Sequence, residues 1–257
     1  MNVGIMGFGE VGSSLTKVIQ EKHNIYIHDK KEVSHEEKLK EGQKIDILHI
    51  CIPYTDDFLD EVTRLAKKTN PNLIIVNASV PLGTTRKIEE LTKIDTVHIP
   101  IRGIHPRLAE SIKTFTVYIG ASSDRAGKKA VDYLKEFKLN IVKANNPEET
   151  ELAKLLSTTY YAWNIVFCKE VKKLCDSYNL DFETVYTDFN KTYNKGYTKM
   201  NKKEVVRPVL KPVPGPIGGH CLIPNAKILK SMEKRDNIAQ RLAALILEWN
   251  KEYKNEN

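Results

Sequence analysis

The chain opens with a glycine pattern that strongly restricts its fold. A short apolar run, residues 3–6, leads directly into Gly7-x-Gly9-x-x-Gly12, and a segment with helical character follows. Asp29 stands 22 positions after Gly7, at the end of a second apolar run. A strand, a glycine-rich turn, a helix and an acidic residue at about this distance form the dinucleotide-binding motif of Rossmann domains. We therefore expect a dinucleotide site here rather than the glycine-rich turn of some other α/β domain.

Each glycine has a distinct expected role. Gly7 permits the tight turn, Gly9 lets the backbone approach a pyrophosphate, and Gly12 lets the helix pack closely on the strand. The helix N-terminus then faces the phosphate charge. Asp29 would bind the adenosine ribose, which favours NAD because a carboxylate repels a 2′-phosphate. Lys30 could weaken that preference, so NADP stays open. The residues assigned to the cofactor are Gly7, Phe8, Gly9, Glu10, Val11, Gly12, Asp29, Lys30, Ile52, Pro53 and Ser79.

Residues 1–145 alternate between strand and helix patterns. Further buried strands are predicted over 44–53, 72–81, 95–101, 116–122 and 140–144, with helices over 56–68, 84–93 and 125–138. Continuous apolar strands separated by helices are typical of a parallel, doubly wound sheet. The sequence thus predicts an α/β chain whose first domain, 1–145, is a Rossmann dinucleotide-binding domain.

From residue 146 the pattern becomes entirely helical. The segment 147–179 has apolar residues at helical spacing and predicts one helix of about 28 residues. Further helices are expected over 180–193, 224–234 and 237–254. These faces hold more apolar surface than a small helical domain can bury alone. We expect 146–257 to be an all-helical domain that forms a homodimer and contributes to substrate binding.

Composition excludes several classes of protein. With 257 residues, the chain can hold one large or two modest domains. No apolar run approaches 18 residues and no secretion signal is visible, so neither a membrane span nor export is expected. The four cysteines have no metal-ligand spacing and the histidines are scattered, which predicts reduced thiols, a cytoplasmic location and no metal.

The net charge of +7 is concentrated in one segment, 191–211, where lysines alternate with tyrosines. The segment could be a solvated loop, or a loop that closes over an anionic small molecule. Nucleic-acid binding is a less favoured alternative, because no nucleic-acid-binding motif accompanies the charge.

Four motifs together resemble the UDP-glucose/GDP-mannose dehydrogenase family, within a larger group that includes the 6-phosphogluconate and β-hydroxyacid dehydrogenases. They are GFGEVG (7–12) with Asp29, ASVPLGTT (78–85), ETELAKLLST (149–158) and PGPIGGHCLIPN (214–225). The last is the most specific. The resemblance covers two of the family's three domains and does not extend to its nucleotide-sugar-binding domain.

The resemblance implies roles for three residues. Cys221 matches the family nucleophile, which captures an aldehyde as a thiohemiacetal; its oxidation gives a thioester that water hydrolyses. Lys154 matches a lysine that holds a water or the developing oxyanion, and also the acid/base lysine of β-hydroxyacid dehydrogenases. Ser79 matches a threonine that positions the water. A thiolate suits the covalent step.

Departures from the family motifs weaken the inference that this chain carries out a double oxidation. Thr158 stands where the family has Asn, Asn225 stands where it has Asp, and Arg107 lies near the place of a family Glu. The residues assigned to catalysis are Lys154, Cys221, Ser79, Thr158 and Asn225. Those assigned to an anionic substrate are Arg102, His105, Arg107, Glu110, Glu151, Gly218, Gly219 and His220, with the two arginines as a clamp or, alternatively, as surface ion pairs.

Three hypotheses follow, in order of preference. The first is an NAD-dependent dehydrogenase that oxidises an alcohol of an anionic metabolite, with single hydride transfer slightly favoured over two. The second is a non-catalytic dinucleotide-binding protein that kept the fold. The third is a nucleic-acid- or partner-binding protein that uses the basic segment 191–211.

Overall fold

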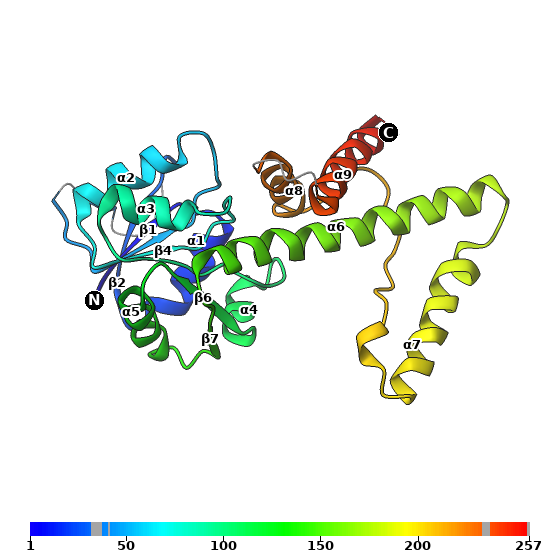
Figure 1. Cartoon of the computed structure of the whole chain (residues 1–257), viewed down its shortest axis with the longest axis horizontal. Coiled ribbons are helices and arrows are strands. Elements are labelled where there is room, and N and C mark those ends of the chain that lie inside the picture. The colour runs from blue at the N-terminus through cyan, green and yellow to red at the C-terminus, as the bar shows by residue number, and fades with distance from the viewer. Residues whose placement is uncertain (32–37, 41, 233–236, 256–257) are drawn as a thin grey trace. The chain divides into compact units, whose positions relative to one another are not determined.

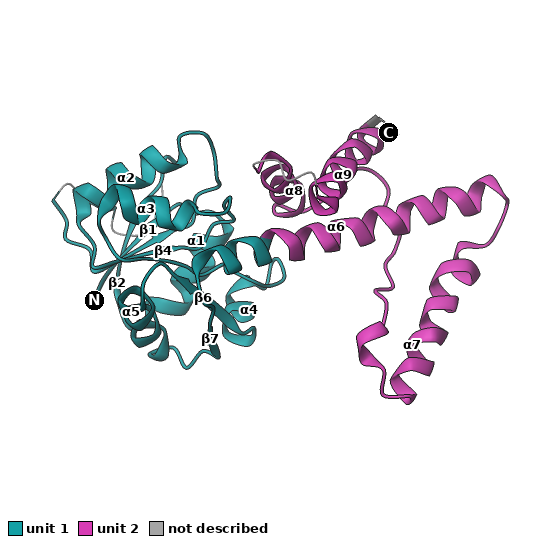
Figure 2. Cartoon of the chain, viewed as in Figure 1, with its two compact units in different colours: residues 1–154 teal, residues 155–257 magenta. Residues whose placement is uncertain are grey.

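The structure is a computed structural model that describes residues 1–31, 38–40, 42–232 and 237–255. The chain divides into two compact units, residues 1–154 and 155–257 (Figure 2). The boundary falls inside one long helix, because the first turns of that helix hydrogen-bond to the sheet unit. The sequence pattern predicted a domain boundary after residue 145, and that division stays a prediction.

Unit 1 is built on a seven-stranded sheet of order β2-β1-β3-β4-β5-β6-β7. The strands are β1 (Asn2–Met6), β2 (Asn24–His28), β3 (Ile47–Ile50), β4 (Leu73–Val76), β5 (Thr96–His98), β6 (Val117–Ala121) and β7 (Ile141–Lys143). The order reverses beside β1, which creates the switch point where doubly wound sheets bind ligands. The α/β fold class is therefore confirmed.

The sheet is mostly parallel, as expected, but it contains one antiparallel pair. Strands β1 to β5 are parallel, but β6 pairs antiparallel with β5 and parallel with β7. After β5 the chain forms a short helix, α4 (Leu108–Thr114), and enters β6 only two residues after that helix ends. It does not first return to the sheet edge from which β1 to β5 start. Helix α4 was not expected from the sequence.

Helices cover both faces of this sheet (Figure 1). They are α1 (Glu10–Ile19), α2 (Phe58–Thr69), α3 (Thr84–Thr92), α4 and α5 (Asp124–Lys135). One core cluster joins α1, α4 and α5 to side chains such as Ile5 and Ile75; the other joins α2 and α3 to neighbours such as Met6 and Ile74. Successive residues of a strand point to opposite faces. The continuous apolar strands therefore supply both cores at once.

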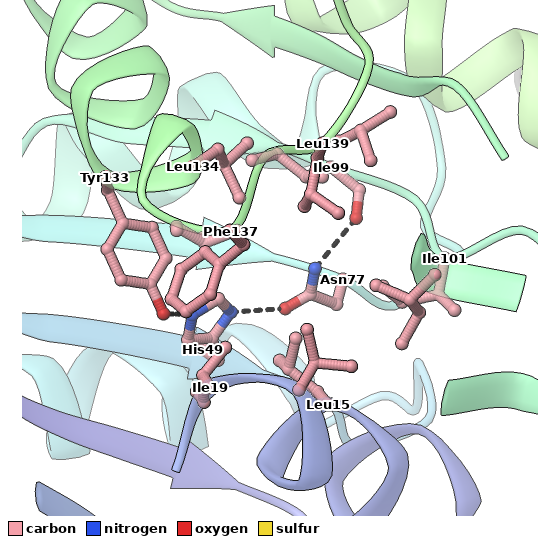
Figure 3. Close-up of a pocket in the computed structure, with 14 residues that line it drawn as sticks. Leu15, Ile19, His49, Asn77, Ile99, Ile101, Tyr133, Leu134, Phe137 and Leu139 are labelled. Carbon is pink, nitrogen blue, oxygen red and sulfur yellow. Dashed lines mark hydrogen bonds between the residues drawn. The ribbon is translucent and has the colours of Figure 1, made fainter. Parts of the chain in front are cut away.

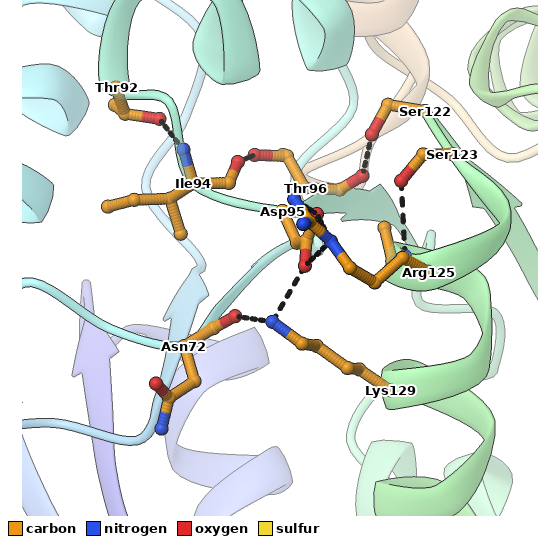
Figure 4. Close-up of polar contacts among 10 residues, drawn as sticks. Asn72, Thr92, Ile94, Asp95, Thr96, Ser122, Ser123, Arg125 and Lys129 are labelled. Carbon is orange, nitrogen blue, oxygen red and sulfur yellow. Dashed lines mark hydrogen bonds and ion pairs between the residues drawn. The ribbon is translucent and has the colours of Figure 1, made fainter.

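A buried carboxylate ties α5 to the start of β5 (Figure 4). The side chain of Asp95 is 1% exposed and accepts hydrogen bonds from Arg125 Nε at 2.9 and 3.0 Å. Lys129 Nζ lies 2.6 Å from the same carboxylate and donates to the Asn72 carbonyl at 2.9 Å. Burial opposes ionisation, but the two cations more than offset it and hold the pKa of Asp95 below its usual value.

Unit 2 continues the long helix and adds shorter ones. Its elements are α6 (Pro147–Ser177), the π-helix η1 (Glu183–Asp188), α7 (Phe189–Lys199), the 3₁₀ helix η2 (Lys203–Val205), α8 (Leu222–Ser231) and α9 (Ile238–Asn255). A small core joins Ala162 and Val166 of α6 to Ile217, Ile246 and Tyr253. The end expected for α8, at residue 234, lies outside the described residues.

The basic segment 191–211 is not simply a loop, because residues 191–199 belong to α7. None of the residues of α7 is buried. Within the described residues, no helix is long and apolar enough to cross a membrane.

Candidate functional site

The glycine-rich turn has the geometry that its motif requires. Gly7 has φ +93°, and a Cβ there would lie 2.8 Å from the side chain of Ile52. A Cβ on Gly12 would lie 2.0 Å from the Gly7 carbonyl oxygen, so α1 could not pack as it does with a side chain at this position. By contrast, nothing lies within 4 Å of the corresponding point on Gly9. The space above Gly9 is open at the N-terminus of α1, where an anion is favoured.

Asp29 is anchored beside this turn. Its carboxylate accepts hydrogen bonds from the Phe8 amide at 2.6 Å and from the Lys31 amide at 2.8 Å. Burial opposes ionisation, but these amides more than offset it and lower the pKa of Asp29. A carboxylate has about four lone-pair positions, so further hydroxyl donors can be accepted. Lys30 points to another partner, Glu61 of α2, at 2.5 Å.

A buried histidine holds the segment that carries Ser79. His98 Nε2 lies 3.1 Å from the Ala78 carbonyl, and Nδ1 lies 2.8 Å from the Thr150 hydroxyl. Burial lowers the pKa of His98 to about 4, so the ring is neutral near pH 7. Because a carbonyl only accepts, Nε2 carries the proton and Nδ1 accepts from Thr150. The half-buried Ser79 follows directly in the chain.

Two further residues at the start of α6, Glu151 and Lys154, bind the segments that follow β4 and β5. Glu151 is fully buried, and its carboxylate accepts from Gly83 N at 2.7 Å, Thr85 N at 2.9 Å and Thr85 Oγ1 at 2.6 Å. Burial raises the pKa of Glu151 despite these donors. Lys154 Nζ donates to the Ile101 carbonyl at 2.7 Å. The structure thus places Lys154 just beyond β5, whereas the Glu151 carboxylate, expected to face substrate, binds the first turn of α3.

A second buried histidine network joins His49 of β3, Asn77 directly after β4 and Tyr133 of α5 (Figure 3). Asn77 Nδ2 donates to the Ile99 carbonyl at 2.8 Å, which leaves Asn77 Oδ1 to accept from His49 Nδ1 at 2.7 Å. Burial lowers the pKa of His49 to about 4, so Nε2 is unprotonated and accepts from the Tyr133 hydroxyl at 3.0 Å. The network is satisfied and fixes the end of β4, from which Ser79 follows.

The segment after β5 does not present a free cationic clamp. Arg107 Nε donates to Glu110 Oε2 at 2.7 Å on an exposed surface. The Arg102 guanidinium lies over the ring of Tyr118 at 5.4 Å. His105 Nδ1 lies 3.0 Å from Glu10 Oε2. Arg107 thus forms a surface ion pair, which is the alternative to a clamp, whereas Arg102 lies over an aromatic ring; contact of either arginine with substrate stays a prediction.

In unit 2, the predicted residues fall into two groups. Asn225 Nδ2 donates to Thr158 Oγ1 at 3.0 Å. The side chains at the two positions that depart from the family motif are therefore hydrogen-bonded to each other. Cys221 is half-buried and is the N-cap residue of α8. The preceding Gly218, Gly219 and His220 are exposed.

The loop before Cys221 is held by residues that the sequence analysis missed. Lys169 is 8% exposed and donates to the Val213 and Gly215 carbonyls. Asn250 Oδ1 accepts from Ile217 N at 2.7 Å. The available signal for Lys169 was a lysine within the apolar pattern of a long helix. His49 and His98 gave the same kind of signal, a polar residue inside a continuous apolar strand.

Comparison with known proteins confirms the resemblance. Residues 148–252 match the central domain of the UDP-glucose/GDP-mannose dehydrogenase family. A UDP-N-acetyl-D-mannosamine dehydrogenase of Methanococcus vannielii is 25% identical over 134 residues, which is 51% of this chain and 28% of that protein. One from Methanocaldococcus jannaschii is 25% identical over 156 residues, 54% of this chain and 36% of that protein. The matched part therefore spans about a third or less of these relatives.

Solved structures show the same fold over nearly the whole chain. A UDP-D-ManNAc dehydrogenase from Pyrococcus horikoshii superposes with a TM-score of 0.79 at 19% identity, over 98% of this chain and 69% of that one. A UDP-glucose dehydrogenase from Pyrobaculum islandicum gives 0.74 at 17% identity, over 98% and 68%. The 3-hydroxyisobutyrate dehydrogenase of Mycobacterium tuberculosis gives 0.67 at 12% identity, over 99% and 94%.

Proposed function

We propose that this chain, similar to nucleotide-sugar dehydrogenases, binds NAD in preference to NADP and oxidises an alcohol group of an anionic metabolite. The observation that carries the proposal is the open space above Gly9 at the N-terminus of α1, with the Asp29 carboxylate anchored beside it. When bound, the nicotinamide would supply the hydride acceptor. Nucleotide sugars are the first substrates to test, because the UDP-sugar dehydrogenases named above act on them.

Lys154 is the residue that we assign to proton transfer. Its amine lies beyond the carboxyl end of β5, held by the Ile101 carbonyl, on the sheet edge where doubly wound folds bind ligands. An alcohol that loses a hydride from carbon must also lose its hydroxyl proton, and the Lys154 amine would take that proton. Ser79, on the neighbouring β4 segment, would orient the substrate hydroxyl. Cys221 would add a covalent step only if a second oxidation takes place.

The cofactor proposal is tested by calorimetric titration with NADH and NADPH. We expect low-micromolar binding of NADH and weaker binding of NADPH. Replacing the carboxylate in Asp29→Ala should weaken NADH and reduce the difference between the two ligands. Asp132→Ala, an exposed carboxylate on α5, is the matched control. If neither NADH nor NADPH binds, the proposal is refuted.

The catalytic part needs its own experiment. Lys154→Ala should keep NADH affinity, which shows that the unit is folded, and should lose reduction of NAD with any nucleotide sugar that the wild type oxidises. Turnover that survives this substitution would refute the assigned role. The Asn225–Thr158 bond, which replaces charge with a neutral pair, favours a second candidate: a dinucleotide-binding protein without catalysis. NADH binding without turnover on any alcohol screened would favour that candidate.

We also propose a homodimer formed through the helical unit. Tyr160, Phe167 and Leu174 repeat every seven residues along α6 and are 60%, 50% and 58% exposed. A repeat of this kind forms a stripe that a facing helix can cover. The expected result is a dimer in sedimentation analysis that Phe167→Glu dissociates. A monomeric wild type would refute the proposal.

A further inference from the structure

Glu10 places a negative charge in the first turn of α1, next to the backbone amides where a dinucleotide pyrophosphate is expected. It is the first residue of α1 and follows the open glycine of the turn. The first intrahelical bond runs from Ser13 N to Gly9 O at 2.9 Å, so the amides of residues 10–12 precede it. Such amides attract an anion. The Glu10 carboxylate, 49% exposed, repels the same anion.

His105 provides the compensating group. Its Nδ1 lies 3.0 Å from Glu10 Oε2, and its side chain is 33% exposed. Because a carboxylate only accepts, Nδ1 carries the proton and donates it. This bond joins the segment after β5 to the N-terminus of α1, two regions far apart in the sequence.

The other cationic groups of that segment are engaged elsewhere. Arg107 forms its two-point contact with Glu110, and Arg102 lies over the rings of Phe115 and Tyr118. His105 is therefore the hydrogen-bond donor of this segment that reaches the first residue of α1.

We propose that His105 is a pyrophosphate-binding residue that Glu10 holds in place until the dinucleotide arrives. On binding, the His105 N–H exchanges the Glu10 carboxylate for a phosphate oxygen. The exchange gives the pyrophosphate a hydrogen-bond donor from His105, and the segment after β5 moves together with that side chain. This inference rests on the proposed dinucleotide binding, and it assigns His105 to the cofactor rather than to the substrate.

The test compares ligands that contain the pyrophosphate with one that lacks it. Affinities of NADH and ADP-ribose are measured by calorimetry, and that of adenosine by ligand-observed NMR, for wild type and variants with unchanged thermal midpoints. Loss of one charge-assisted hydrogen bond in His105→Ala should weaken NADH and ADP-ribose by roughly 5- to 20-fold and leave adenosine unchanged. His105→Lys should restore part of the affinity. Glu10→Gln should tighten both pyrophosphate ligands by a few-fold.

The control is Lys113→Gln on α4, which removes an exposed positive charge nearby in the chain and should change nothing. Equal effects of His105→Ala on all three ligands would show a merely structural role and overturn the inference. Weaker binding in Glu10→Gln would also overturn it. If neither the wild type nor Glu10→Gln binds NADH, the proposed function itself fails; wild-type binding that His105→Ala leaves intact refutes the inference alone.

Discussion

The Glu151 carboxylate provides the sharpest prediction about stability. In Glu151→Ala, the amides of Gly83 and Thr85 and the Thr85 hydroxyl lose their acceptor in a buried setting. Loss of a helix N-terminal acceptor costs about 0.5–2 kcal/mol, and each buried donor left unpaired about 1–3 kcal/mol. Because the cavity left by the shortened side chain can admit water, we expect about 2–3 kcal/mol.

The assay is native-state hydrogen exchange at the Gly83 and Thr85 amides, which reports on unit 1 without assuming that the whole chain unfolds in one step. A loss of 2–3 kcal/mol predicts exchange faster by roughly 30- to 140-fold. The matched control is Glu148→Ala, which removes an exposed ion pair between α6 and Arg86 of α3. Such pairs contribute about 0–1 kcal/mol. Equal exchange in the two variants would refute the argument that burial gives Glu151 its effect.

Three further predictions concern other polar contacts. Because the pKa of Asp95 is lowered on folding, its contribution to the free energy of unfolding is present above the unfolded-state pKa and is lost as pH falls through the folded-state pKa. We therefore expect the free energy of unfolding of Asp95→Asn to decrease less steeply at acid pH than that of the wild type. Urea unfolding at several pH values would measure this difference. Burial lowers the pKa of His49 from 6.5 to about 4, so its neutral form contributes stability that is lost as pH drops below 6.5, by about 2 kcal/mol between pH 7 and pH 5. In His49→Gln, the free energy of unfolding should lose this part of its pH dependence. An unchanged pH dependence would contradict the assignment of a neutral His49. Lys169→Met should free the loop before Cys221 and speed alkylation of that thiol several-fold, whereas Lys173→Met, one helical turn further along α6, should not; equal rates would count against the anchoring role.

Much of unit 1 was predictable because its signals are local. The glycine motif and the continuous apolar strands depend on neighbouring residues only, and both appear where expected. The antiparallel β6 was not predictable, because strand direction depends on how α4 returns the chain. Likewise, Glu151 could be recognised as part of a motif, but its contacts with Thr85 and Gly83 could not be predicted. These residues lie 66 and 68 positions away in the sequence, and only the fold brings them to the Glu151 carboxylate.

The predicted substrate residues show the same limit. Charge and spacing indicated Arg102 and Arg107, yet Arg102 lies over the ring of Tyr118 on β6 and Arg107 pairs with Glu110 three residues along the chain. A sequence reveals that a charge is present but not which partner neutralises it. In contrast, Lys169 and His98 gave only the signal of a polar residue in an apolar pattern, and their carbonyl partners could not be deduced from it.

The first turns of α6 also constrain how this chain can change in length. Thr150, Glu151 and Lys154 are anchored to three different places in unit 1: to His98, to the first turn of α3, and to the Ile101 carbonyl. Each residue of an α-helix turns the chain by about 100°. A single insertion or deletion between Pro147 and Thr150 would therefore rotate all three side chains away together, so natural length variation should fall in the turn before Pro147 instead.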